Sequence, residues 1–283
     1  MADRNACQLG KLLTALDDPR YDIFLHIDAK SRLGKTFRPE CYVHQAGIQL
    51  IPPMKVYWGG YSQVECELAL LRAATDSEHS YYHLISGLDL PLHSADDVIS
   101  FFRRHRGTEY VSVEENESLG TLSAEAYNRV AWRYPLQNSI FGGRSLFHIR
   151  SCRAVQRLLR VDRIRERHMP LAKGPNWFSI TDAFARYVLS ESQTIRHMFK
   201  SALCPDELFM QTILINSPFA ARSCDLKGYQ NTRLIDWKRG GPYTFLQSDA
   251  EELANSPALF ARKFDEVIDS RIIDEVIASD KRH

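Results

Sequence analysis

Strand-forming and helix-forming segments alternate through the first two thirds of this 283-residue chain, and this alternation is the feature that most restricts its fold. The apolar run Tyr21 to Ile27 (YDIFLHI) predicts a buried strand, and Ser62 to Ala74 has the period of a helix capped by its first serine. Further strands are predicted over Tyr81 to Ile85 and Glu109 to Val113, with a helix over Ala95 to Arg104 between them. We therefore expect an α/β fold, a mixed central sheet flanked by helices.

The rest of the chain continues the pattern after an irregular stretch. About residues 114 to 150 are polar and aromatic without a clear period, as expected of a functional loop such as a binding lip. The segments predicted after it are a basic helix over Ser151 to Arg167, a strand over Asn176 to Ile180, helices over Thr181 to Leu189 and Pro205 to Ile213, and strands near Phe219 and Arg233.

No repeat, low-complexity tract or Pro/Gly-rich linker interrupts the sequence, so a single domain over residues 1–283 is expected. An open α/β sheet usually begins with a strand, whereas this chain begins with a helical pattern over Gln8 to Leu16. We therefore expect the first strand to be missing at the N-terminus.

Composition excludes several classes of function. The formal charge is +1, from 36 Lys plus Arg against 35 Asp plus Glu, so no global field attracts nucleic acid. Six cysteines lack CxxC or Cys/His spacing, which favours reduced thiols over disulfides or a zinc site. No apolar run approaches the roughly 18 residues of a membrane span, and no signal-peptide core is present. A cytoplasmic protein without a transmembrane segment is expected.

Polar residues stand at four places where strands end or helices begin, and ligands of open α/β sheets bind at that edge. The four groups are His26 with Asp28; Ser86, Gly87 and Asp89; Asn176 with Trp177; and Pro205, Asp206 and Glu207. A purely structural role is the alternative to ligand binding for these residues. Asp28 and Asp89 also suit turns, and Glu207 also suits the first turn of a helix, where it complements the helix dipole.

Two glycines and two basic pairs in the C-terminal third are further candidates for ligand binding. Gly59 and Gly60 in WGGYS allow a backbone to approach a ligand, although a tight turn explains them equally well. The pairs Lys238/Arg239 and Arg262/Lys263 lie among aromatic residues, so each is a candidate to bind a pyrophosphate, with a solvated surface as the alternative. The chain contains no Asp-x-Asp, so a sugar transferase of this sequence must replace the divalent ion with side chains.

Seven stretches occur in an order that resembles the core-2/I-branching β-1,6-N-acetylglucosaminyltransferases and the related protein xylosyltransferases. They are YDIFLHIDAKS, VYWGGYSQVECELALL, YYHLISGLDLPL, KGPNWFSIT, PDELFMQT, RLIDWKRG and LFARKFDE. The resemblance extends from about Gln8 to Asp269. It implies a GT-A-type nucleotide-sugar-binding fold, inversion at the anomeric carbon and independence from metal.

The resemblance also implies roles for individual residues. Glu207, in PDE, matches the catalytic base; Lys263 matches one cation on the donor diphosphate, and Arg239 is our choice for the second, across a loop shorter than in animal members. The expected nucleotide and donor side consists of His26, Asp28, Gly60, Ser62 and Asp89, and the acceptor side of Trp177, Asp206 and Trp237.

The expected reaction is transfer of a sugar, best matched by N-acetylglucosamine, from a UDP-sugar to a hydroxyl of a glycan or polysaccharide acceptor through a β-1,6 linkage. No cofactor, metal or nucleic-acid partner is expected. UDP-xylose or UDP-glucuronate as donor, and a non-catalytic glycan-binding protein on the same fold, are the alternatives.

Overall fold

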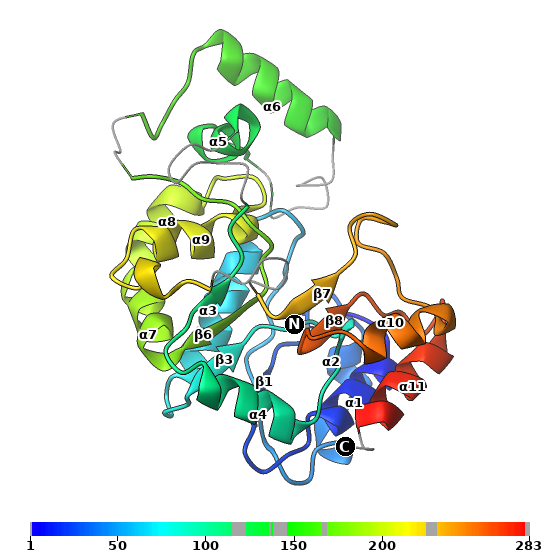
Figure 1. The fold of residues 1–283 in the computed structure, drawn as a ribbon. Coiled ribbons are helices and arrows are strands. Elements are labelled where there is room, and N and C mark those ends of the chain that lie inside the picture. The colour runs from blue at the N-terminus through cyan, green and yellow to red at the C-terminus, as the bar shows by residue number, and fades with distance from the viewer. Residues whose placement is uncertain are drawn as a thin grey trace. The chain divides into compact units, whose positions relative to one another are not determined.

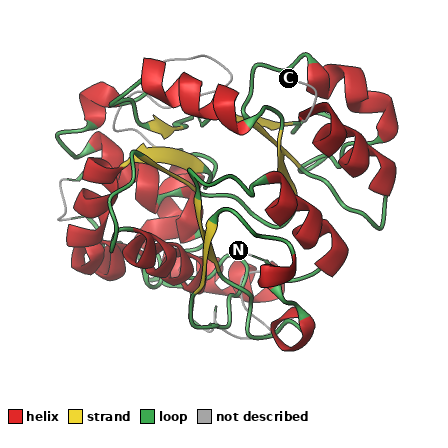
Figure 2. Ribbon diagram, turned by 90° about the horizontal axis from the view of Figure 1, so that it is seen from below, coloured by secondary structure: helices red, strands yellow, loops and turns green. Residues whose placement is uncertain are grey.

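The computed structural model describes residues 2–114, 123–135, 137, 146–165, 169–224 and 231–280. The chain forms two compact units, and each is described by itself. Unit 1 comprises Met1–Met54, His83–Gly107 and Leu226–His283, and unit 2 comprises Lys55–Tyr82 and Thr108–Asp225. The predicted mixture of helices and strands is confirmed, and the described strands form three small sheets among the helices (Figures 1 and 2). The single-domain organisation stays a prediction.

Unit 1 contains two of these sheets. β1 (Asp22–Leu25) pairs in parallel with β2 (Gly47–Leu50). β8 (Phe260–Arg262) lies between β4 (Asp89–Pro91), which is antiparallel to it, and β7 (Arg233–Ile235), which is parallel. The helical elements are α1 (Ala6–Ala15), α2 (Leu33–Thr36), η1 (Pro39–Cys41), α4 (Ala95–Arg104), η4 (Gln247–Asp249), α10 (Ala250–Ala254) and α11 (Ser270–Asp280).

The core of unit 1 follows from the apolar spacing of its helices. Leu9, Leu12 and Leu13 place one face of α1 in the core, and Ile272, Ile273 and Val276 do the same for α11. Before α1, Ala2 forms a parallel bridge to Ile27: it donates its N–H to the His26 carbonyl at 2.9 Å and accepts that of Asp28 at 2.9 Å. The residue before the first helix therefore extends the pairing of the β1 segment.

Unit 2 has its strands in the order β3 (Tyr81–His83, whose last residue is counted with unit 1), β6 (Phe178–Thr181) and β5 (Tyr110–Val111). Every residue of β6 is buried. Its helices are α3 (Ser62–Ala74), α5 (Ala124–Ala131), α6 (Leu146–Leu158), α7 (Asp182–Ser190), α8 (Ser192–Phe199), η2 (Pro205–Glu207), α9 (Phe209–Ile215) and η3 (Ala220–Arg222). The buried Glu109 carboxylate accepts the Thr181 N–H at 2.9 Å and its hydroxyl at 2.6 Å, which fixes the start of α7 beside β5.

Several predicted elements are corrected. The strand near Phe219 is wrong, because Ser217 accepts the Phe219 and Ala220 N–H groups and turns the chain into η3. The basic helix is α6, which ends at Leu158 because Arg160 adopts a left-handed φ of 51°. The predicted helix over Pro205 to Ile213 is two elements, η2 and α9.

The irregular stretch predicted over residues 114 to 150 contains α5 and the start of α6; residues 115–122, 136 and 138–145 of it lie outside the described residues. All six cysteines are free. Among the described helices, none combines the length and apolar character that crossing a membrane requires.

The pair Asp89 and Arg262 gives a direct test of unit 1. They are cross-strand neighbours of β4 and β8, with Asp89 Oδ1 3.2 Å from the Arg262 guanidinium and only 1% of the Asp89 side chain exposed. Asp89→Ala removes the carboxylate that faces this mostly buried cation, so urea unfolding should show a loss of about 3–5 kcal/mol. The matched change Asp96→Ala, at an exposed ion pair with Arg20, should cost less than about 1 kcal/mol. Equal losses would contradict this role of Asp89.

Candidate functional site

In unit 2 the structure brings the PDE turn against the WGGYS loop. Cys204 donates its N–H to the Gly59 carbonyl at 2.9 Å, and Gln63 Nε2 donates to Asp206 Oδ2 at 2.8 Å. Cys204 itself adopts a left-handed φ of 46°, a conformation that costs a non-glycine residue about 1 kcal/mol. Backbone strain of this kind concentrates at functional sites, where the surrounding contacts hold it.

Glu207 is held by an arginine from α5. Arg129 Nη2 lies 2.6 Å from Glu207 Oε2, and Arg129 Nε donates to the Leu203 carbonyl at 3.1 Å. The Arg129 side chain is 12% exposed, whereas that of Glu207 is 39% exposed. Burial opposes the charge on Arg129, but Cys204 and Glu207 outweigh it and raise the pKa of the guanidinium. Glu207 is thus a fixed carboxylate that still faces solvent.

Asp206 has the opposite environment to its neighbour. It is buried, and burial together with the Glu207 charge raises the pKa of Asp206 to about 7. Burial also raises the pKa of Glu67, on α3, well above its usual range; the Asp206 carboxyl adds to the rise and the Asn176 amide opposes it. Neighbouring acids whose pKa values are pushed in this way are a feature of catalytic sites and of structural acid pairs.

The remaining predicted residues of unit 2 have these positions. Gly60 accepts the Gln63 N–H at 3.1 Å within the turn that begins α3. Ser62 is not the N-cap: that position belongs to Tyr61, and the buried Ser62 hydroxyl accepts the Tyr57 N–H at 2.9 Å instead. Trp177 is half-buried directly before β6. The donor role of Gly60 and Ser62 and the acceptor role of Trp177 stay predictions.

In unit 1, His26 and Asp28 make local hydrogen bonds. Asp28 Oδ1 accepts the Lys30 N–H at 2.8 Å, and the Lys30 ammonium lies 3.3 Å from Oδ2. The buried His26 accepts the Met54 N–H through Nε2 at 3.1 Å, and burial lowers the pKa of the imidazole. These contacts are the ones expected if Asp28 forms a turn. The role of Asp28 in binding a nucleotide stays a prediction.

Asp89 accepts the N–H of Ser86 at 2.8 Å and its hydroxyl at 2.9 Å, so it also organises its own turn. Arg262 lies against it and is mostly buried, so the solvated-surface alternative is wrong for this cation. The neighbouring Arg233 is buried over the Phe260 ring, 4.9 Å from its centroid, and burial lowers the pKa of Arg233 to about 9. A buried arginine, Arg233, and a mostly buried one, Arg262, thus both interact with the Asp89 carboxylate.

Arg239 is held by three carboxylates. Its Nη1 lies 2.7 Å from Asp249, its Nη2 lies 2.7 Å from Glu252, and its Nε donates to Asp236. The guanidinium also stacks 4.2 Å from the centroid of the Tyr243 ring. The hydrogen bond from Arg239 lowers the pKa of Asp236 to about 2. For Arg239 to bind a diphosphate, at least one of these carboxylates has to be displaced.

Lys263 reaches the same part of unit 1 through its backbone. It donates its N–H to the Tyr243 carbonyl at 3.3 Å and accepts the Phe245 N–H at 2.9 Å. Its ammonium makes no ion pair with any residue that the structure describes, in contrast to Arg239. Trp237 is 56% exposed in the loop after β7. The structure thus brings the segments of Arg239 and Lys263 together around Tyr243, and their binding roles stay predictions.

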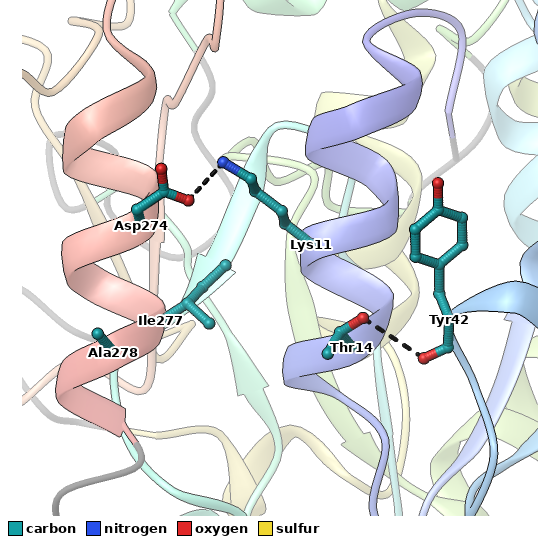
Figure 3. A pocket seen from close by; sticks show the side chains of 6 residues that line it. All are labelled: Lys11, Thr14, Tyr42, Asp274, Ile277 and Ala278. Carbon is teal, nitrogen blue, oxygen red and sulfur yellow. Dashed lines mark hydrogen bonds and ion pairs between the residues drawn. The ribbon is translucent and has the colours of Figure 1, made fainter.

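A pocket on unit 1 lies elsewhere, between α1 and α11 (Figure 3). Lys11 and Asp274 form an ion pair across it, and the Thr14 hydroxyl donates to the Tyr42 carbonyl at 3.5 Å. None of the predicted site residues lines it. Within the described ranges, no group of three His, Cys, Asp or Glu side chains is arranged to hold a metal.

Sequence reasoning missed Arg129, Gln63 and Glu67. Arg129 lies in a stretch without a recognisable motif, and its partner Glu207 is 78 residues away in sequence. Gln63 and Glu67 belong to one of the matched stretches, and their spacing of four residues puts them on one face of α3. The position of Glu67 on the apolar face of α3 could have indicated a site, because a buried acid needs a compensating partner.

Comparison with known proteins agrees with the resemblance seen in the seven sequence stretches. The family model described as Core-2/I-Branching enzyme matches residues 8–255. Relatives include xylosyltransferase 1 of Homo sapiens at 22% identity, xylosyltransferase 2 of Bos taurus at 21% and xylosyltransferase sqv-6 of Caenorhabditis briggsae at 23%. The alignments cover 96%, 95% and 96% of this chain but only 29%, 31% and 35% of the relatives, so the chain spans about a third of their length.

Asp206 makes the stability of the protein depend on pH. Because its pKa rises from 3.8 to about 7 on folding, the folded state binds more protons than the unfolded state between these values, and stability falls as pH rises through that window. Asp206→Asn cannot ionise, so its advantage over the wild type in thermal unfolding should grow between pH 5 and pH 8, by on the order of 2 kcal/mol.

The control is Asp182→Asn, since Arg186 and Tyr82 lower the pKa of Asp182 against the effect of burial. Asp182→Asn removes the carboxylate that pairs with Arg186, so this variant should be less stable than the wild type at pH 8. A constant difference between Asp206→Asn and the wild type across the pH range would contradict a proton bound at Asp206.

Proposed function

The chain belongs to the core-2/I-branching enzyme family, and on that premise we propose that it is a glycosyltransferase that moves a sugar from a UDP-sugar to a hydroxyl of a glycan acceptor. Its mixed α/β fold agrees with the GT-A-like fold of that family. The observation that carries the proposal is Glu207: a solvent-facing carboxylate, fixed by a mostly buried arginine, directly after a buried acid.

Glu207 is proposed as the general base. A base must reach the proton that it removes and must hold its position during the attack. The Glu207 carboxylate meets both conditions, because Oε2 is fixed by Arg129 at 2.6 Å while 39% of the side chain faces solvent. In the proposed step the carboxylate takes the acceptor hydroxyl proton as the oxygen bonds to the anomeric carbon, and the bond from that carbon to the UDP oxygen breaks.

Lys263 and Arg239 are proposed to stabilise the charge that develops on the departing diphosphate, which would make the reaction independent of metal. The contacts of the two residues support different roles in stabilising the diphosphate. Lys263 forms no ion pair with the residues that the structure describes, whereas Arg239 has its three nitrogens on Asp236, Asp249 and Glu252. A diphosphate, which carries more charge than one carboxylate and accepts two parallel hydrogen bonds, is the kind of ligand that can displace one of them.

Two donors are the first to test. UDP-N-acetylglucosamine, with a β-1,6 linkage, is the proposal that follows from the resemblance to the branching enzymes. UDP-xylose is the second candidate, and the names of the relatives, all xylosyltransferases, favour it. Discrimination between such donors rests on few contacts, so hydrolysis of both, and of UDP-glucuronate, should be compared by the release of UDP.

The proposed base is tested by Glu207→Gln. With the best donor of that panel, kcat should fall by about 10²- to 10⁴-fold because the amide cannot accept the proton. Donor affinity, measured by calorimetry, should stay within about twofold, since the change removes an interaction made only in the transition state. Glu191→Gln, at a half-buried glutamate between α7 and α8, is the matched control. Full transfer by Glu207→Gln would reject the assignment.

The proposed replacement of the metal is tested with Lys263→Ala. The variant should lose about 10²-fold in kcat, the scale of one electrostatic contact to the transition state, whereas Lys238→Ala, at the exposed lysine beside Arg239, should keep its rate. EDTA should leave the wild-type rate unchanged. A rate that vanishes in EDTA and returns with Mn²⁺, or equal rates in the two lysine variants, would overturn the role of Lys263.

A further inference from the structure

Exposed apolar side chains are concentrated on α6 and the turn that follows it. Phe147 and Leu158 are each 83% exposed, Leu159 is 66% exposed and Val155 is 55% exposed. These are four of the nine large hydrophobic side chains that stand exposed among the described residues. Single exposed apolar residues need no explanation, but a group of them on one short segment is typical of an interaction surface.

Helix geometry puts these side chains on one face. Phe147, Ala154 and Leu158 are separated by seven and four residues, so they follow one another along the same side of α6, with Val155 beside them. The other side of the helix is attached to unit 2. Ile149 and Cys152 pack against a cluster around Tyr134, and Gln156 exchanges two hydrogen bonds of 2.7 Å with the Arg133 backbone. The helix is therefore anchored by one face and presents the other outward, beside α5 (Figure 1).

The charged residues of α6 itself and of the turn after it are all arginines. Arg150 and Arg157 are exposed and flank it on one side, and Arg160 follows in the turn. No aspartate or glutamate occurs between Leu146 and Val161, although the whole chain has a net charge of only +1. Arginine side chains beside an apolar stripe can extend to the headgroups of a lipid layer while the stripe enters it.

We propose that the outward face of α6, formed by Phe147, Val155, Leu158 and Leu159 with Arg150, Arg157 and Arg160, binds the surface of an anionic lipid membrane. The helix lies in the plane of the interface, with its apolar side chains among the acyl chains and its arginines at the phosphates. A second copy of this chain fits less well, because two such faces would bring the same exposed arginines together. The proposal does not depend on sugar transfer.

The test is sedimentation with vesicles, using the whole protein. Vesicles of phosphatidylglycerol and phosphatidylcholine should bind it, and vesicles of phosphatidylcholine alone should bind at least about tenfold less, since the arginines supply much of the attraction. The double variant Phe147→Ser/Leu158→Ser and the double variant Arg150→Gln/Arg157→Gln should each lower binding by about tenfold or more. Salt at about 0.5 M should weaken the binding of the wild type to anionic vesicles.

Two controls test whether vesicle binding belongs to the α6 face itself. Arg103→Gln/Arg104→Gln removes two exposed arginines from the end of α4 and should leave binding unchanged. Thermal unfolding should be the same for all variants, because each changes exposed side chains. Binding that persists in both α6 variants, or that is equal on neutral vesicles, would overturn the proposal. Concentration-dependent dimers that Phe147→Ser/Leu158→Ser abolishes, without vesicle binding, would show instead that the face joins two copies.

Discussion

The proposed chemistry of unit 2 depends on one guanidinium, that of Arg129, which fixes Glu207 beside a buried acid. Three acids, Glu67, Asp206 and Glu207, interact electrostatically, and Arg129 is the cation beside them. A buried carboxylate without compensation is too costly to keep ionised, so the acids must differ in their state. The turn geometry separates them: successive side chains of a 3₁₀ helix point about 120° apart, which sends Asp206 inward and leaves Glu207 at the surface.

In unit 1 the charge balance around Asp89 is the opposite, because two arginines interact with this one carboxylate. Arg233 is buried and Arg262 mostly buried near Asp89, and a carboxylate removed from that position would take away a counter-charge with which both interact. Outside this group, Arg239 is neutralised by its three carboxylates whereas Lys263 forms no ion pair within the described part of the chain. In the proposed role, a diphosphate would meet one cation that has no ion pair among the described residues and one that must exchange partners, and this exchange would make binding depend on the charge of the ligand.

Local pattern predicted much of the fold. The strand predicted over Tyr21 to Ile27 is observed as β1 (Asp22–Leu25), and the helix predicted over Ser62 to Ala74 is observed as α3 with the same bounds. Both predictions rested on periodicity, whereas the functional role assigned to the PDE turn from a matched stretch stays a prediction. Contacts between distant segments did not follow. The Arg129–Glu207 pair joins two segments with no shared pattern, and the end of α6 is set by a left-handed Arg160 that composition does not reveal. Asp89 and Asp28 were ambiguous because a turn and a ligand site use the same oxygen atoms.

The helix α5 links the two surfaces that unit 2 offers. Glu125 and Arg129 are four residues apart and therefore lie on the same side of α5. Glu125 binds Arg153 of α6 at 3.1 Å, and Arg129 binds Glu207 at 2.6 Å. A displacement of α6 at a lipid surface would act on α5 through the Arg153–Glu125 pair, and also on the cluster of Tyr134, Leu203 and Cys204 against which α6 packs. Because Arg129 is mostly buried and also bonds the Leu203 carbonyl, it resists such a displacement, so the outer pair, Arg153 with Glu125, is the one that yields first.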